Sequence, residues 1–104
     1  MNYHVVFAPA ASQDLENLLI YLAARMGAER ARLYVGEIQA YCLNFSTFPK
    51  RGMRRSDLRP GLRLVGYRRR ATIAFEVSGD AVIIARIFHR GRHVDLDDEA
   101  GDPD

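Results

Sequence analysis

Two adjoining stretches with apolar residues at helical spacing constrain the fold of this chain more than any other feature of its sequence. The first begins near Pro9 and ends at Gly27, and the second runs from about Ala28 to about Phe45. Their apolar positions are Ala11, Leu15, Leu18, Leu19 and Leu22, then Ala31, Tyr34, Val35, Ile38, Tyr41, Cys42 and Phe45. Because only a few residues join the stretches, they predict an antiparallel helical hairpin whose apolar stripe must pack against something else.

Short runs with β character supply that partner. They cover residues 3–7, 62–67, 71–77 and 81–88, with a Ser-Gly-Asp turn between the last two and a surface loop from Lys50 to Gly61. The order is therefore β-α-α-β-β-β. We expect an α+β fold in which the helical hairpin packs on one face of a small, mainly antiparallel sheet, with the last strand inside that sheet.

Composition narrows the class of protein. A chain of 104 residues with 48% hydrophobic residues is expected to form one domain, here residues 1–94. The single cysteine excludes an internal disulfide framework and favours the cytoplasm, and the N-terminal residues do not resemble a signal peptide. No apolar run approaches the roughly 18 residues of a membrane span. Zinc-ligand spacing and nucleotide-binding glycine loops are also missing, so we expect no metal and no cofactor.

The charges are strongly separated along the chain. Residues 50–70 hold nine bases and one acid, whereas residues 95–104 hold six acids and no base. Fourteen of the fifteen bases are arginines, whose planar guanidinium groups suit carboxylate and phosphate recognition. The pattern favours an anion-binding surface followed by a disordered acidic tail over residues 95–104, and the alternative is a solvated surface that only confers solubility.

Few residues suit catalysis. Cys42 falls on the helical stripe and is expected in the core. Most of the carboxylates that could form a catalytic pair are expected on solvated helix faces or in turns; the candidates are Asp14, Glu16, Glu29, Glu37, Asp57, Glu76 and Asp80. The remaining group is His89 and His93 with Arg86, Arg90 and Arg92, where the last predicted strand ends. These residues could activate the 2′-hydroxyl of RNA, hold phosphates without reacting, or anchor the end of the sheet.

Four motifs in chain order resemble one protein family. They are "YHVVFAPAASQDLENLLIYLA" with its Ala-x-x-Asp-Leu, "CLNFSTFPKRGMR", "DLRPGLRLV" and the closing "IARIFHRGR". Together they resemble the ParE branch of the ParE/RelE toxins over nearly the whole chain up to about Val94. The resemblance implies a non-catalytic toxin of a type II toxin–antitoxin (plasmid stabilisation) system that poisons DNA gyrase. It also implies a ParD-like antitoxin that forms a hetero-oligomeric complex with the toxin. In that complex the antitoxin binds operator DNA, and the toxin is linked to the DNA only through the antitoxin.

The RelE branch, which cuts mRNA on the ribosome, is the alternative, and a toxin that has lost its potency is a third possibility. Only Lys50 is a lysine, and no Tyr or Phe follows His89, which departs from the RelE pattern and favours ParE. ParE chains often have Asp after the final arginine, where this chain has His93. The target-contact candidates are Arg59, Arg63, Arg86, His89 and Arg92, and the antitoxin-contact candidates are Tyr21, Tyr34 and Tyr41. For Arg86 and His89 the alternative role is to fix the sheet end, and for the tyrosines it is core packing.

Overall fold

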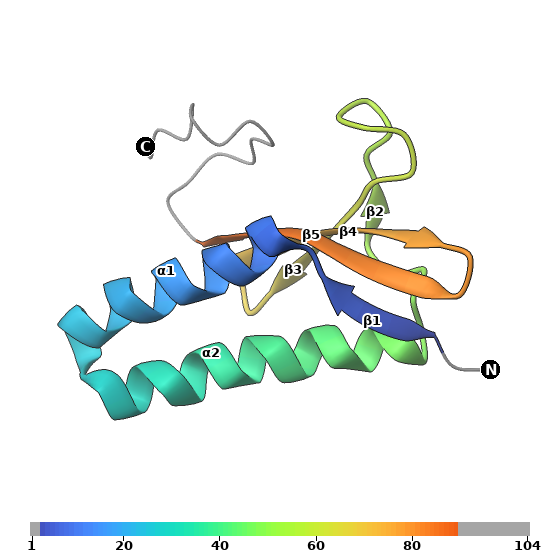
Figure 1. Ribbon diagram of the computed structural model, residues 1–104. Helices are drawn as coiled ribbons and strands as arrows, with labels where there is room; N and C mark the ends of the chain where they lie inside the picture. The colour runs from blue at the N-terminus through green and yellow to red at the C-terminus, as the bar shows by residue number, and fades with distance from the viewer. Residues whose placement is uncertain (1–2, 90–104) are drawn as a thin grey trace.

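A layer of two helices covers one face of a five-stranded sheet in the computed structural model of the protein, which describes residues 3–89 (Figure 1). The elements in chain order are β1 (His4–Phe7), α1 (Pro9–Met26), α2 (Ala28–Leu43), a 3₁₀ turn (Asn44–Ser46), β2 (Met53–Arg54), β3 (Arg63–Tyr67), β4 (Ala71–Ser78) and β5 (Ala81–His89). The predicted α+β fold is confirmed. Arg92 and the acidic segment 95–104 lie outside the described residues, so the predicted division of the chain at residue 94 stays a prediction.

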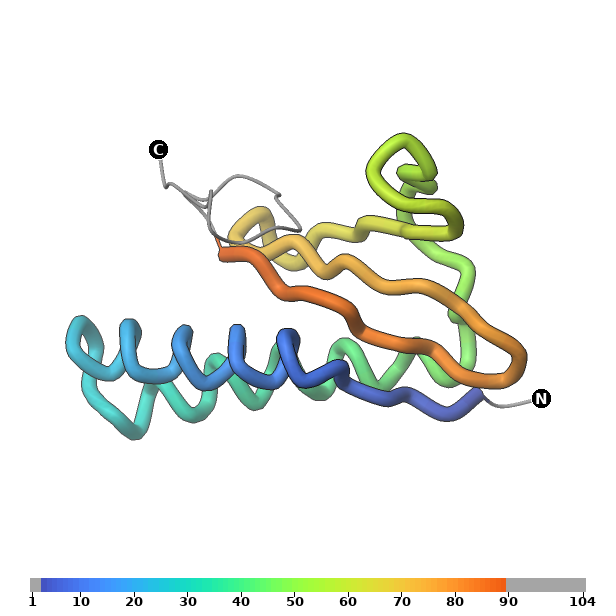
Figure 2. Tube along the Cα trace, turned by 45° about the horizontal axis from the view of Figure 1, so that its top comes forward, coloured from blue at the N-terminus to red at the C-terminus, as the bar shows by residue number. Residues whose placement is uncertain are grey.

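The sheet is mainly antiparallel, as predicted. Its strand order is β1-β5-β4-β3-β2, and only the β1–β5 pair is parallel. The last strand therefore lies inside the sheet between β1 and β4, which also agrees with the prediction. Figure 2 shows β5 running beside β4 along its length, while the far end of the helical hairpin extends beyond the sheet.

The helical hairpin forms where the apolar spacing placed it. Pro9 begins α1, where its missing N–H costs nothing, and Gly27 joins the helices with a φ of 93° that favours glycine. The second helix is two residues shorter than predicted, because the chain tightens into a 3₁₀ turn at Asn44. That turn still places Phe45 in the core, fully buried against Phe75 at a ring-centroid distance of 4.7 Å.

One element was not predicted. Met53 and Arg54 form the short edge strand β2, paired with β3, inside the segment predicted as a surface loop. Gly52 makes this pairing possible: its φ is 79°, and a Cβ at this position would collide with the carbonyl oxygen of Leu64. A strand of two residues shows no periodicity, so its position depends on the register with β3 and not on its own sequence.

The sheet has apolar contacts on both faces. The main core lies between the helices and residues of β3, β4 and β5, and the smaller one on the opposite face consists of Leu62, Ala74 and Phe88, with Leu64 packed against it. Leu62 reaches that face because hydrogen bonds close the turn from Arg55 to Leu62. Burial on both faces explains why the inner strand β5 is an almost continuous run of apolar residues. Within residues 3–89, no helix is long and apolar enough to cross a membrane.

Candidate anion-binding surface

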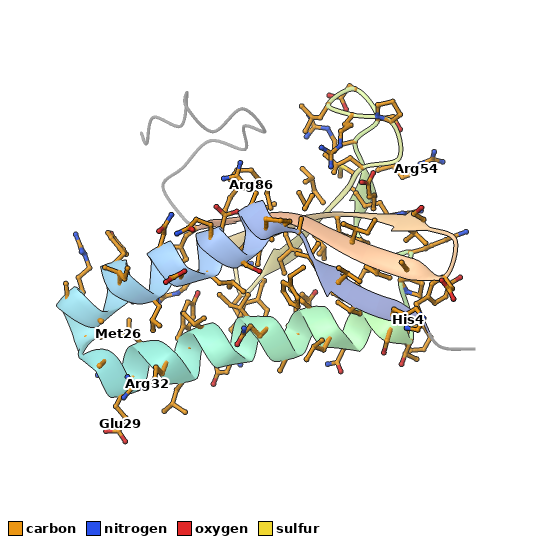
Figure 3. The ribbon with its side chains drawn as sticks, in the orientation of Figure 1. His4, Met26, Glu29, Arg32, Arg54 and Arg86 are labelled. Carbon is orange, nitrogen blue, oxygen red and sulfur yellow. The ribbon has the colours of Figure 1, made fainter. Side chains whose placement is uncertain are left out.

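Arg86 in β5 is held by a carboxylate inside the fold. Its Nε donates to Oδ2 of Asp14 at 2.8 Å and its Nη2 donates to Oδ1 at 2.9 Å, and the two side chains are only 11% and 13% exposed. Figure 3 shows Arg86 beside the beginning of α1. The bidentate geometry is the strong form of an arginine–carboxylate pair. The structure therefore favours the alternative role of Arg86, in which it fixes the end of the sheet and does not contact a target.

Asp14 also completes the hydrogen bonding of the sheet. β1 pairs with β5 only as far as Ile84, whose carbonyl accepts from the N–H of Ala8. Beyond that point the edge of β5 faces the beginning of α1, and Oδ2 of Asp14 accepts the N–H of Ile87 at 2.8 Å. One carboxylate thus replaces the missing strand partner and pairs the neighbouring guanidinium.

The expectation that Asp14 lies on a solvated helix face was wrong. The residue follows Ala11 by three positions and precedes Leu18 by four, so it falls on the same stripe as the buried residues of α1. That spacing was visible in the sequence. A carboxylate on an apolar stripe is buried only if a partner neutralises it. The spacing of Asp14 does not reveal that partner, because it lies 72 residues away in the chain.

Arg59 lies in the turn before β3, and Arg63 is the first residue of β3. Arg59 forms an ion pair with Glu76 at 3.6 Å, and both side chains stay partly exposed, at 42% and 31%. Arg63 donates to the backbone oxygen of Arg51 at 3.5 Å and is paired across the strands with Phe75, on the helix-covered face. Arg86 is paired with Ala74, whose side chain belongs to the smaller apolar cluster. Arg63 and Arg86 therefore point to opposite faces of the sheet.

His89 ends β5 opposite Ala71, and the hydroxyl of Tyr34 lies 3.5 Å from its Nε2. The rings of Tyr34 and His89 meet edge to face, with centroids 6.0 Å apart. Ala71 is five residues from Glu76 on β4, so His89 lies roughly 17 Å along the sheet from the Arg59 ion pair. The structure does not bring the described target-contact candidates together at one edge.

A different group of arginines gathers at the end of the sheet next to His89. Arg68, Arg69 and Arg70 connect β3 to β4, and the N–H of Arg70 donates to the carbonyl of Tyr67 at 3.0 Å. Two of them have left-handed backbone angles, with φ of 52° at Arg68 and 59° at Arg69. Both central residues of a type I′ turn have such angles, and Asn or Gly is the usual choice. In the sequence these arginines are visible only as part of the basic stretch, although the short gap between two β runs predicts a turn there.

A shallow pocket of about 200 Å³ opens beside this turn. Its walls include Gly66, Arg69, Arg70, Thr72, Phe88 and His89. Arg68 forms an ion pair of 3.0 Å with Glu37 on α2, and both side chains stay exposed. Among residues 3–89, the side chains of Arg69 and Arg70 form no hydrogen bond or ion pair. Two guanidinium groups therefore lie beside this pocket without a carboxylate partner among residues 3–89.

The three candidate tyrosines differ in exposure. Tyr21 on α1 is exposed at its ring, over which the guanidinium carbon of Arg25 lies at 3.8 Å. Tyr34 and Tyr41 on α2 are partly buried and pack against the main core, and Tyr41 contacts Tyr67 with ring centroids 4.8 Å apart. Burial raises the pKa of the Tyr34 hydroxyl. Of the three, Tyr21 is the most accessible to a partner.

Neither a reactive thiol nor a metal site is found within the described residues. Cys42 is fully buried, and burial raises the pKa of its thiol to about 12, so it is protonated and unreactive at neutral pH. No group of three or more His, Cys, Asp or Glu residues within the described part of the chain is placed to hold a metal ion.

The fold is that of small α+β toxins found in toxin–antitoxin complexes. The chromosomal ParDE system from P. aeruginosa contains a similar chain, with a TM-score of 0.74 at 23% identity over 84% of this chain and 95% of that one. The RelBE2 toxin–antitoxin complex from Mycobacterium tuberculosis has a TM-score of 0.62 at 18% identity, over 86% of this chain and all of that one. At these identities the likeness establishes the fold.

The sequence identifies the family within that fold. Residues 5–94 match the family described as the ParE toxin of the type II toxin–antitoxin system parDE. The chain is also 30% identical over 84 residues to Toxin ParE3 of Caulobacter vibrioides. These aligned residues cover 81% of this chain and 83% of that protein. The chain therefore belongs to the ParE toxin family of type II toxin–antitoxin systems, as the sequence motifs suggested.

Proposed function

We propose that this ParE-family toxin arrests growth in the bacterial cytoplasm by poisoning DNA gyrase, without bond-breaking chemistry of its own. The observation that carries the proposal is the family match over residues 5–94, because the ParE branch is the one whose implied target is gyrase. The arrangement of Arg86 supports a binding role over a catalytic one. Its guanidinium is buried against Asp14, so it is not presented to a scissile phosphate.

Among the target-contact candidates, we assign direct contact to Arg59 and Arg63. Both keep part of the side chain accessible, and neither is sequestered by a buried carboxylate. Arg86 acts as a positioning residue that holds the end of β5, and His89 lies at that end beside Tyr34. Arg92, which lies outside the described residues, is retained as a contact candidate from the sequence.

We propose that the toxin is neutralised by a ParD-like antitoxin in a hetero-oligomeric complex. Only the antitoxin contacts operator DNA in this complex. An acidic, amphipathic segment of that antitoxin would complement the excess of arginine and cover exposed apolar side chains. Tyr21 is its first candidate contact because its ring is accessible on α1. Tyr34 and Tyr41 are secondary candidates, since the core already covers much of each ring.

A plasmid cleavage assay tests the gyrase proposal. Purified toxin is incubated with gyrase, ATP and supercoiled plasmid, and the reaction is stopped with detergent and protease. We expect linear DNA to accumulate only when toxin and gyrase are both present. Linear DNA without gyrase would reveal a nuclease, and mRNA cleavage on translating ribosomes without any effect on gyrase would establish the RelE-type alternative.

Paired charge variants test the contact residues in the same assay. R59Q/R63Q removes both proposed contacts, and R30Q/R32Q removes two charges from exposed positions near the far end of the helical hairpin, where Figure 3 labels Arg32. Since hydrogen bonds to charged groups contribute about 1.5–3 kcal/mol each, R59Q/R63Q is expected to need at least about tenfold more toxin. Equal potency of the two double variants would remove Arg59 and Arg63 from the contact surface.

A further inference from the structure

The turn between β3 and β4 carries arginines where a turn alone would not select them. Arg68 and Arg69 both have positive φ, a conformation in which a side chain with a Cβ is strained and Asn or Gly is favoured. Residues in such conformations persist where the side chain has a use, and they cluster at ligand-binding sites. The question is which ligand the two strained arginines and their neighbour Arg70 would bind.

The three arginines are not equivalent. Arg68 is committed to the fold through its ion pair with Glu37 and through its position 5.1 Å from the ring of Tyr67. Arg69 and Arg70 are exposed, line the pocket beside the turn, and have no side-chain counterion among residues 3–89. The fold thus anchors one arginine and leaves two guanidinium groups for a ligand.

The pocket residues indicate the chemistry of that ligand. Thr72 adds a hydroxyl to the two guanidinium groups, and no carboxylate lines the pocket among the residues that the structure describes. A phosphate group has oxygens in a tetrahedral arrangement that can accept from two guanidinium groups and a hydroxyl together, whereas the two oxygens of a carboxylate lie in one plane. Gly66 leaves room at the pocket wall, since an added Cβ there would come no nearer than 3.9 Å to the carbonyl oxygen of Ala71.

The size of the pocket indicates how much of the ligand it would hold. Its volume of about 200 Å³ is smaller than the roughly 300–1,000 Å³ of sites that enclose a whole small molecule. It therefore fits one group of a larger ligand that stays mostly outside. We propose that Arg69, Arg70 and Thr72 form a binding site for one backbone phosphate of a nucleic-acid strand.

This site is separate from the contacts assigned to Arg59 and Arg63. The turn lies at the end of β4 that begins with Ala71, whereas Arg59 is paired with Glu76 farther along the same strand. A strand crossing from one group to the other would span roughly 17 Å, which corresponds to several nucleotides. Binding is expected of the toxin alone, so the proposal goes beyond the gyrase proposal and does not depend on it.

Fluorescence anisotropy of labelled oligonucleotides tests the site without gyrase. The purified full-length chain is titrated against a DNA duplex and a single-stranded RNA at several salt concentrations. The variants are R69G, which also suits the positive φ at this position, and R70Q. R32Q removes one charge from α2 and serves as the matched control.

We expect R69G and R70Q each to weaken binding about tenfold at low salt, as the loss of a charge-assisted contact predicts, and R32Q to weaken it less than twofold. Each pocket variant should also reduce the slope of log K against log salt by about 1. Binding of either DNA or RNA supports the proposal, because both present the same phosphodiester group. Equal losses in all three variants, or no binding by the unmodified chain, would overturn it.

Two competitors identify the source of the anion. A mononucleotide that displaces the oligonucleotide as well as an unlabelled strand does would overturn the assignment to a nucleic-acid backbone and point to a free nucleotide. Poly-glutamate that competes equally at matched charge would show that the turn binds an acidic protein segment instead. Displacement by unlabelled strands alone supports the proposed site.

Discussion

Arg86 and Arg69 lie toward the same end of the sheet and illustrate two different uses of arginine. Arg86 is buried, bound by both oxygens of Asp14, and lies on a strand whose hydrogen bonding the same carboxylate completes. Arg69 is exposed on a left-handed turn and has no counterion among residues 3–89. The first arrangement stabilises the fold and the second costs stability. The number of charges along a sequence therefore does not separate arginines that stabilise the fold from arginines that stay exposed.

The largest effect is expected from breaking the buried pair. Asp14→Ala removes the bidentate carboxylate that binds the guanidinium of Arg86 and the acceptor of the Ile87 N–H, so we expect a loss of about 3–5 kcal/mol in the free energy of unfolding. Urea unfolding followed by circular dichroism measures it. The double variant D14L/R86M removes both charges together and should recover part of that loss. If D14A unfolds at the same urea concentration as the unmodified chain, the pair of Asp14 and Arg86 does not stabilise the fold.

Cys42 differs from Arg86 because burial alone acts on its ionisation, and the described residues offer no charged partner to its thiolate. Burial raises the pKa of its thiol to about 12, so the folded chain keeps the proton above pH 9 while the unfolded chain releases it. The unfolded state then binds fewer protons, and stability falls as pH rises, by about 1.4 kcal/mol per unit between about pH 9 and pH 12.

The pH dependence of Cys42 is isolated by comparison with Cys42→Ala, which keeps every other titrating group. Urea unfolding of both proteins is measured from pH 7 to pH 10.5. The two stability curves are expected to run parallel below about pH 8 and to converge above pH 9, because only the unmodified chain loses stability through the thiol. Curves that stay parallel over the whole range would mean that the thiol ionises as easily in the folded chain as in the unfolded one.

The smallest effect has the opposite sign. Arg69→Gly removes a Cβ from a residue with φ of 59°, and the relief of strain outweighs the added freedom of the unfolded chain by about 0.5–1 kcal/mol. The same change at Arg32, in the regular helix α2, should instead cost about 1 kcal/mol. Thermal unfolding of both variants provides the comparison. A destabilised R69G would show that the arginine side chain contributes to the fold as Arg86 does.

The order of elements followed from local signals in the sequence. Residues such as Leu15, Leu18 and Leu22 repeat at helical spacing, and both helices begin where Pro9 and Gly27 indicate. The three longer strands β3, β4 and β5 also appear within a residue or two of their predicted bounds. In contrast, β2 was missed, because two residues carry no period and their pairing depends on the close approach that Gly52 permits.

The candidate site was predicted less well than the fold. The sequence indicated an arginine-rich surface, and the turn from Arg68 to Arg70 is part of it. It did not indicate that Arg86 is sequestered by Asp14, or that Arg63 and Arg86 point to opposite faces of the sheet. These facts depend on strand register and on a contact between residues 72 positions apart.

By itself, the sequence determined which segments become helices and strands, which family the motifs resemble, and how much positive charge the chain carries, because these are properties of neighbouring residues and of composition. Only the tertiary structure decided which arginines are neutralised inside and which are left for a ligand. A guanidinium is neutralised by whichever carboxylate the folded chain brings within hydrogen-bonding distance, and for Arg86 that carboxylate comes from the first helix.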